Sequence, residues 1–256
     1  MAAVLKDRIS PEEWQARVDL AACYRLAHHY GWTDMTSTHF SARVPGREDV
    51  FLLSPHGLLF EEVTASSLVK VDTDGNVVDG SKARINRAGF VIHSAIHMGC
   101  HDALFALHTH TVAGIAIAAQ KDGLLPISFT ALTVLGEIAY YDGERLPGEV
   151  SEREVIQRMM GGKRILVMHN HGLLTVGRNA GEAFMAMWRM ERACQIQLAC
   201  FQQSGSGFVP MSEAIVKGGI ERGTKAFWQG GANDPVHLEW PALIRKLERM
   251  DPSYKD

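Results

Sequence analysis

Two short histidine clusters, each placed directly after an apolar run, constrain this chain more than any other feature. They are His108-Thr109-His110 after residues 103–107 and His169-Asn170-His171-Gly172 after residues 165–168. A short apolar run is typical of a buried strand, and residues two apart in a strand point to the same side. The two imidazoles of the first cluster can therefore converge on one cation. The sequence predicts a metal site where strands end.

A third imidazole from the second cluster would complete a three-histidine shell. Such a shell leaves coordination positions open, and catalytic metals need them so that water or substrate can bind. A second interpretation stays open at this point. A histidine pair near a strand end can instead be hydrogen-bonded to backbone groups or exposed to solvent.

The composition excludes several classes of protein. The 26 basic and 29 acidic residues are spread over 256 positions, and a net charge of −3 provides no basic surface for nucleic acid or an anionic membrane. No apolar run reaches the roughly 20 residues of a membrane span. The four cysteines never form a Cys-x-x-Cys pair. We therefore expect a cytoplasmic protein that binds a small molecule, with no nucleic acid and no membrane as partner.

The spacing of caps, turns and apolar residues predicts an α/β fold. Ser10 and Pro11 are typical of a helix start, and the apolar spacing extends this helix to about His29. The other expected elements are helices at 90–98, 111–120, 151–160, 180–203 and 240–250, strands at 103–107, 164–168 and 173–176, antiparallel hairpins at 38–54 and 67–79, and a mostly irregular middle around Pro126, Gly136 and Pro147.

Four motifs in a fixed order resemble the class II aldolase/adducin family. They are Asn86-Arg87-Ala88-Gly89-Phe90-Val91-Ile92-His93, His108-Thr109-His110, Gly123-Leu124-Leu125-Pro126-Ile127 and His169-Asn170-His171-Gly172-Leu173. The resemblance extends from about Leu20 to Gln203, and stretches such as 60–70 look most like the adducin head domain. It implies a three-layer α/β/α fold assembled as a homotetramer. With the antiparallel-rich pattern, we expect a mostly antiparallel central sheet in one domain of residues 1–256, with a core at about 15–205 and a helical tail at 206–256.

The resemblance also implies a set of metal ligands. In the aldolases of this family, the two His-x-His imidazoles and the histidine before Gly-Leu bind zinc. By position, these are His108, His110 and His171 in this chain. Zinc is the favoured cofactor, while Fe²⁺, Mn²⁺ and Co²⁺ also suit imidazole ligands.

The chain departs from the family's aldolases at the acid/base position. The family's glutamate is replaced by Gly89, which can neither transfer a proton nor bind zinc. We therefore predict that His93 or Tyr140 supplies the proton. The phosphate-binding turn of the family carries His56 here, and we predict that His56 and Arg87 bind the substrate, with the Arg87 guanidinium holding a carboxylate. A solvated loop arginine is the alternative for Arg87.

Three functions are compatible with these residues. The first is a divalent-metal-dependent lyase, aldolase-like or decarboxylase-like, that acts on a small oxo or hydroxy acid. The second is a non-haem iron(II) oxygenase of aryl 2-keto acids, and the third is a non-catalytic, adducin-like interaction domain of the cytoskeletal type. We favour the lyase, because the chain keeps all three site histidines, which the adducins partly lose.

Overall fold

A seven-stranded sheet forms the centre of the computed structural model, which describes residues 5–142, 149–202, 207–228, 234 and 237–256. The strands are β1 (His39–Arg43), β2 (Val50–Leu53), β3 (Val69–Asp72), β4 (Phe105–Thr109), β5 (Ile138–Tyr141), β6 (Ile165–Met168) and β7 (Gly172–Gly177). Their order across the sheet is β3-β2-β1-β4-β7-β6-β5. Neighbouring strands are antiparallel except β5 and β6, which are parallel. The predicted mostly antiparallel sheet is confirmed.

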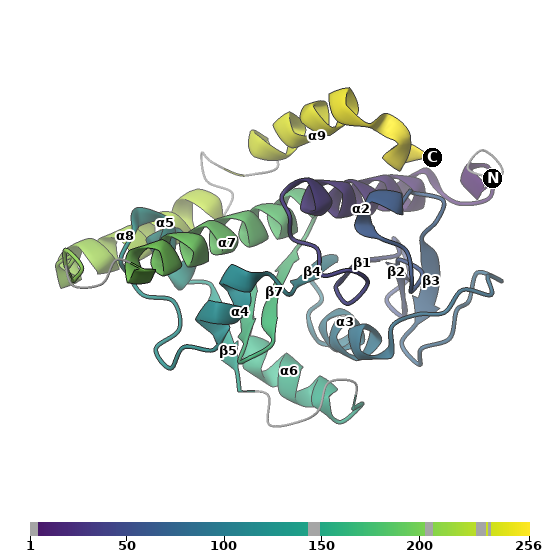
Figure 1. Cartoon of the computed structure of the whole chain (residues 1–256). Helices are drawn as coiled ribbons and strands as arrows, with labels where there is room; N and C mark the ends of the chain where they lie inside the picture. The colour runs from purple at the N-terminus through teal and green to yellow at the C-terminus, as the bar shows by residue number, and fades with distance from the viewer. Residues whose placement is uncertain (1–4, 143–148, 203–206, 229–233, 235–236) are drawn as a thin grey trace.

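Helices cover both faces of this sheet (Figure 1). The helices are α2 (Pro11–His29), α3 (Arg87–Gly99), α4 (Val112–Ala118), α5 (Phe129–Leu135), α6 (Glu152–Met160), α7 (Ala180–Gln202), α8 (Glu213–Phe227) and α9 (Glu239–Met250), with short 3-10 turns η1 (Phe60–Glu62) and η2 (Pro252–Lys255). Helices α3 and α6 pack on one face and α2, α4 and α7 on the other, while α8 lies against α5 and α9 against α2 and α7. The three-layer α/β/α arrangement is confirmed.

The core is divided by the sheet, because side chains alternate along each strand. On β4, Leu107 packs among the residues of α2 and α7, including Phe184. Its neighbour Ala106 packs on the opposite face with Ile92 of α3 and Ile156 of α6. A sheet that is buried on both faces explains why the strands are continuous apolar runs. Any polar side chain on either face of β4 is therefore enclosed as well.

The first helix has the ends that its sequence predicts. The Ser10 side chain accepts a hydrogen bond from the Glu13 N–H, Pro11 is the first helical residue and the helix ends at His29. Gly31 follows with a φ of +72°, a left-handed conformation that glycine adopts at little cost.

The stretch that we expected to be mostly irregular contains α5 and β5, and helix α8 was not predicted. Helix propensity does not predict α8, because the segment contains several glycines and glycine disfavours helices. The structure shows why they occur there: a Cβ on Gly219 would lie 2.4 Å from Leu132 Cδ1, and one on Gly223 would lie 2.8 Å from Thr133 Cα. The glycines allow α8 to pack closely against α5.

The second predicted hairpin is shorter than expected. Strand β3 forms, but the segment after the turn joins it through a single bridge between Val71 and Val77. Beyond α7, the expected boundary between core and tail at 205 and 206 lies outside the described residues. None of the described helices is long and apolar enough to cross a membrane.

Candidate metal centre

His108, His110 and His171 converge beside the carboxyl end of β4. Each offers a ring nitrogen, and these atoms lie within 4.8 Å of one another. The ring centroids are 4.7 Å apart for His108 and His110, 4.8 Å for His108 and His171, and 4.9 Å for His110 and His171. The structure thus brings together the three residues that the sequence predicts as ligands, which we call the triad.

Local backbone geometry explains the second histidine motif. Residues 169–171 form the turn between β6 and β7, and Asn170 has a φ of +56°, in the left-handed region that asparagine tolerates. Gly172 is required by close approach, because a Cβ there would lie 2.3 Å from the Thr109 carbonyl oxygen. This turn places His171 next to the end of β4.

Two of the predicted ligands are oriented by hydrogen bonds at one ring nitrogen, Nδ1. His108 Nδ1–H donates to the Leu173 carbonyl at 3.0 Å, and His110 Nδ1–H donates to the Asp34 carboxylate at 3.1 Å. With each Nδ1 engaged in this way, the Nε2 atoms of the two rings face each other, 2.9 Å apart. A cation at this place would be coordinated by both nitrogens. The donor set fits a divalent metal.

The electrostatic environment keeps these rings in the form that binds metal. Burial, with smaller contributions from neighbouring histidines, lowers the pKa of His108 well below 6.5. Burial and the neighbouring His110 lower the pKa of His171 to about 4. Neutral imidazole is the metal-binding form, so at neutral pH no proton has to be displaced from these two residues.

His93 lies on α3 and faces the sheet near the triad without belonging to it. It is fully buried, and its Nε2 is 2.7 Å from His39 Nδ1. His39 on β1 is the cross-strand partner of His108, and their rings are 5.1 Å apart. Ser41 on β1 contacts both His93 and His97, the latter one helical turn further along α3.

Sequence reasoning assigned no role to His39, Ser41 or His97. The signals were present as two spacings: residues 39 and 41 lie on one face of a strand, and residues 93 and 97 lie on one face of a helix. Neither spacing indicates which strand and which helix face each other. Only the packing of α3 on β1 joins them.

The other predicted site residues lie outside the triad. The Tyr140 hydroxyl accepts a hydrogen bond from the Leu124 N–H at 3.0 Å, and burial raises the pKa of Tyr140. Arg87 is exposed at the start of α3, and His56 is exposed in the turn after β2. Among the described residues, no hydrogen bond, ion pair or ring contact joins these three side chains to the triad.

A buried carboxyl group lies on the other face of β4. Glu191 of α7 accepts a hydrogen bond from the Thr111 hydroxyl at 2.5 Å and one from the Thr109 hydroxyl at 3.5 Å. These threonines flank His110 in the sequence. Burial raises the pKa of Glu191 to about 7, although both hydroxyl contacts oppose the shift. Sequence reasoning missed this group, since a glutamate in a long helix is usually exposed.

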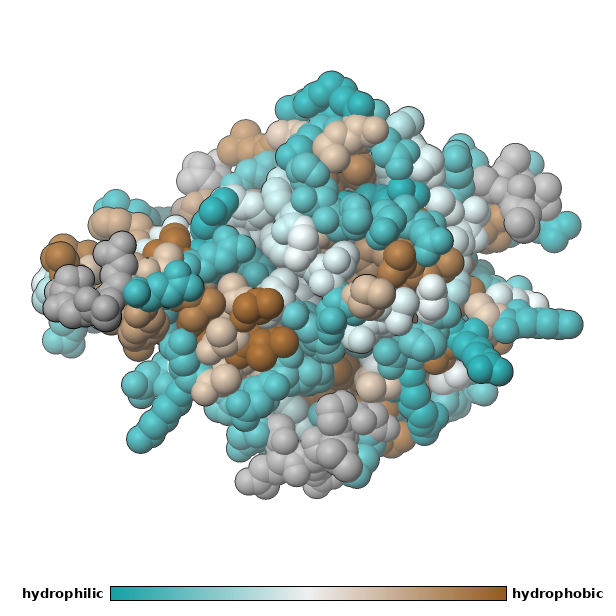
Figure 2. All heavy atoms as spheres, viewed as in Figure 1, coloured by the Kyte–Doolittle hydropathy of each residue, from teal (hydrophilic) through white to brown (hydrophobic). Residues whose placement is uncertain are grey.

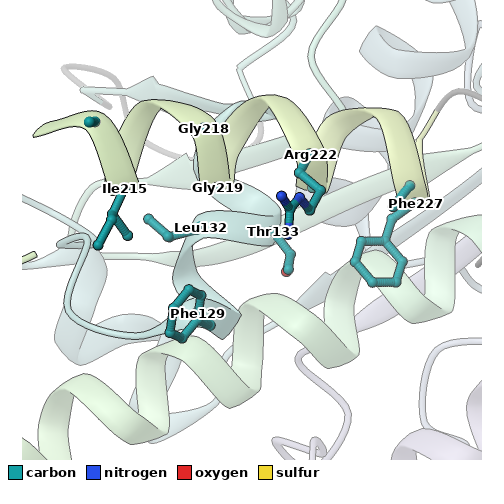
Figure 3. A pocket seen from close by; sticks show the side chains of 11 residues that line it. Phe129, Leu132, Thr133, Ile215, Gly218, Gly219, Arg222 and Phe227 are labelled. Atoms are coloured by element: carbon teal, nitrogen blue, oxygen red, sulfur yellow. The ribbon is translucent and has the colours of Figure 1, made fainter. Parts of the chain in front are cut away.

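An apolar groove of about 530 Å³ lies between α5 and α8 (Figure 3). Phe129, Leu132, Ile215 and Phe227 line it, and Arg222 is its charged residue. Figure 2 shows apolar side chains exposed over this end of the molecule, where Phe129 is 71% exposed. The groove contains neither an acid/base pair nor a metal ligand, so the triad is the better candidate for chemistry.

Comparison with known proteins extends these observations to the whole chain. Residues 18–198, which include the triad, match the model of a family described as the class II aldolase and adducin N-terminal domain. The crystal structure of an aldolase II superfamily protein from Pseudomonas syringae is 46% identical, with a TM-score of 0.92 over 99% of this chain and 100% of that one.

Two further relatives differ in the functions that their names state. An L-fuculose 1-phosphate aldolase from Glaciozyma antarctica is 25% identical, with a TM-score of 0.81 over 100% of this chain and 99% of that one. Alpha-adducin of Rattus norvegicus is 44% identical over 91% of this chain, but the match covers 33% of the adducin. The chain is thus similar both to a named enzyme and to about a third of an adducin.

Proposed function

Because the chain belongs to the class II aldolase and adducin family, we propose that it is a divalent-metal-dependent lyase that cleaves or decarboxylates a small oxo or hydroxy acid. The observation that supports this proposal most strongly is the convergence of three imidazoles: ligand atoms of His108, His110 and His171 lie within 4.8 Å of one another, and the Nε2 atoms of His108 and His110 face each other at 2.9 Å.

The residues of the triad would hold the metal, with zinc favoured and Fe²⁺, Mn²⁺ and Co²⁺ also suited to imidazole. When bound, such a cation supplies a Lewis acid that polarises a substrate carbonyl. The Leu173 carbonyl and the Asp34 carboxylate keep His108 and His110 in the correct tautomer and orientation. Three imidazole ligands leave room for a substrate that binds through two oxygen atoms.

The proton must come from a group other than residue 89, because Gly89 has no side chain. His93, which the sequence suggests for this task, contacts His39 Nδ1 through its Nε2 and not the triad itself, so we propose that it acts through His39 by orienting that ring. Tyr140 remains a second proposal, and its raised pKa keeps its hydroxyl protonated at neutral pH. Substrate binding by Arg87 and His56 also remains a proposal.

We propose in addition that the chain assembles with copies of itself into a tetramer, as the family resemblance implies. The exposed apolar side chains around the α5–α8 groove support this proposal, because exposed apolar clusters are typical of subunit contacts. The variant Phe129→Glu should shift the sedimentation coefficient towards smaller species. Val78→Glu, at a half-exposed position on the β3 hairpin, is the control and should not. The location in the cytoplasm stays a prediction.

The identity to alpha-adducin favours one alternative, a non-catalytic interaction domain. The two proposals differ in their dependence on metal. An adducin-like module would bind its protein partner whether or not the triad is intact, whereas the lyase would lose its activity when a ligand is removed. Co-sedimentation with actin filaments tests the alternative directly.

The experiment that tests the lyase is elemental analysis of protein purified without chelators, followed by assays under anaerobic conditions. We expect close to one zinc per chain, and release of pyruvate or carbon dioxide from hydroxy or oxo acids that stops in His110→Ala. Oxygen consumption with iron(II) and an aryl 2-keto acid, measured in air, would contradict the lyase proposal and support the oxygenase. Protein that contains no metal and takes none up when it is added would contradict both enzymes.

A further inference from the structure

A row of buried polar side chains continues from the triad into the layer between β1 and α3. It consists of His39, His93, Ser41 and His97, each in contact with the next. His39 Nδ1 is 2.7 Å from His93 Nε2, Ser41 Oγ contacts His93 Nδ1, and Ser41 Oγ is 2.7 Å from His97 Nε2. At the far end, His97 Nδ1 lies 3.2 Å from the carbonyl oxygen of Ala103. This row has no part in the proposed metal coordination.

The far end of the row determines the direction of its hydrogen bonds. A carbonyl oxygen can only accept, so His97 carries its proton on Nδ1 and accepts the Ser41 hydroxyl hydrogen at Nε2. Ser41 then accepts from His93 Nδ1–H. His93 in turn accepts from His39 Nδ1–H. The consequence is that His39 keeps no proton on Nε2.

The opposite direction is less favourable. His93 would then carry its proton on Nε2, where it could also reach the His39 carbonyl at 3.2 Å. His97 would turn a lone pair towards the Ala103 carbonyl, and one hydrogen bond would be lost in a buried place. The first arrangement places four donor hydrogens in hydrogen bonds along the row, whereas the reverse places three, one of which is shared between His39 Nδ1 and the His39 carbonyl.

Both α3 histidines are neutral at physiological pH, as this row requires. Burial lowers the pKa of His93 and of His97 to about 3. The Arg43 guanidinium, whose Nη2 donates to the His97 carbonyl at 2.5 Å, adds to the shift of His97. A positive charge on these rings is therefore excluded near neutral pH, and each ring has one defined donor and one defined acceptor.

Gly89 creates the space in which the His39 ring lies. A Cβ on residue 89 would lie 2.4 Å from His39 Cδ2 and 2.5 Å from His39 Nε2, closer than real contacts allow. The ring also lies beside that of His108, with centroids 5.1 Å apart and planes at 30°. Among the described residues, none forms a hydrogen bond with His39 Nε2. The free nitrogen of the row is therefore at the border of the triad.

We propose that His39 contacts the substrate: its unprotonated Nε2 accepts a hydrogen bond from a hydroxyl group of a molecule held at the triad. Ser41, His93 and His97 are positioning residues that fix this tautomer. The inference rests on the proposed lyase function and narrows the substrate from oxo or hydroxy acids to hydroxy acids, because a keto acid has no hydroxyl hydrogen to donate.

The first test examines the tautomer in the full-length, metal-free protein. Long-range proton–nitrogen correlation spectra of ¹⁵N-histidine-labelled protein at pH 7 identify which ring nitrogen carries hydrogen. We expect His39 to be protonated on Nδ1 and bare on Nε2, with the signals assigned by their loss in His39→Asn. A His39 ring protonated on Nε2 would overturn the inference without affecting the proposed function.

The second test compares two ligands that differ in one hydrogen-bond donor. Glycolate and methoxyacetate both offer a carboxylate and a neighbouring oxygen, but only glycolate has a hydroxyl hydrogen. Visible absorption of the Co²⁺-loaded protein reports the binding of each. We expect the preference for glycolate to fall by about tenfold, the effect of one hydrogen bond, in His39→Asn. The asparagine amide can replace Nδ1 as the donor to His93 but has no group at the position of Nε2.

His39→Gln is the matched variant, because its longer side chain can place an amide oxygen near the position of Nε2 and should recover part of the preference. The affinity for Co²⁺ should stay within about threefold in both variants, since His39 is not a member of the triad. If the ratio of the glycolate affinity to the methoxyacetate affinity were unchanged in His39→Asn, the proposed role of His39 would be overturned. Failure of Co²⁺ to bind the wild-type protein would overturn the proposed function, and this inference with it.

Discussion

The two faces of β4 enclose ionisable groups of opposite kind. On the α3 face, burial lowers the pKa of His93, His97 and His108, so these bases stay neutral even in mild acid. On the α7 face, burial raises the pKa of Glu191 to about 7, so this acid keeps its proton up to a higher pH than an exposed glutamate. One physical cause, the loss of hydration, produces both shifts. Neutral imidazoles are metal ligands, whereas a protonated carboxyl group is not.

The largest expected effect comes from removing one ligand on the α3 face. His110→Ala should lower the metal affinity by at least about 100-fold, because it leaves two ligands of three. The fold should survive, since His110 is only partly buried. Elemental analysis after dialysis, with circular dichroism for the fold, measures both. His169→Ala is the control, because the His169 ring contacts Tyr140 outside the triad. Equal metal loss in the two variants would contradict the ligand assignment.

The second-largest expected effect is that acid lowers the unfolding free energy through the buried histidines on the α3 face. A histidine with a folded pKa of about 3, against 6.5 in the unfolded chain, stabilises the protein above pH 6.5 and loses that contribution as the pH falls towards 3. Between pH 7 and pH 4, His97 alone should account for about 3 kcal/mol of unfolding free energy. Urea denaturation at the two pH values measures this. The unfolding free energy of His97→Asn should fall between pH 7 and pH 4 by that much less than the unfolding free energy of the wild type. The same pH dependence in both proteins would be evidence against a buried neutral His97.

The α7 face should respond in the opposite direction. A carboxyl group whose folded pKa is about 7, against 4.5 unfolded, favours the folded protein at low pH, and this contribution is lost as the pH rises from 4.5 to 7. Relative to wild type, Glu191→Gln should therefore gain about 2 kcal/mol of stability on going from pH 5 to pH 7. Urea denaturation at both values tests this. A variant that loses stability over that range as wild type does would show that Glu191 is ionised in the folded state.

The smallest expected effect comes from Thr111, which links the two faces of β4. Thr111 caps α4 through the Gly114 N–H and donates to Glu191, next to the ligand His110. Thr111→Val removes both hydrogen bonds at nearly constant volume. It should cost about 1 kcal/mol of stability and lower the metal affinity about threefold to tenfold, measured by competition with a chromophoric chelator. Thr111→Ser keeps the hydroxyl and should behave as wild type. A Thr111→Val variant that binds metal with wild-type affinity would show that the Thr111 hydrogen bonds do not influence the triad.

The sequence predicted much of the fold, because its signals are local. The Ser10-Pro11 cap, the apolar strand runs and the long apolar pattern from Ala180 each correspond to an element within a few residues. Helix α8 was missed, since its glycines serve a contact with α5 that is distant in sequence. Strand β5 was missed because it pairs with β6, more than twenty residues further along the chain.

The sequence by itself determined the spacing of His108 and His110 on one strand and, through the family resemblance, named His171 as the third member of the triad. The pairing of β4 with β7 then places His171 beside them. The tertiary structure decided the surroundings: which carbonyl and carboxylate orient the ligands, the row that ends at His39, and the carboxyl group of Glu191 behind β4. The physical reason is burial. Local spacing fixes which way a side chain points, but its hydration, and therefore its protonation and hydrogen-bond direction, depends on the elements that pack over it.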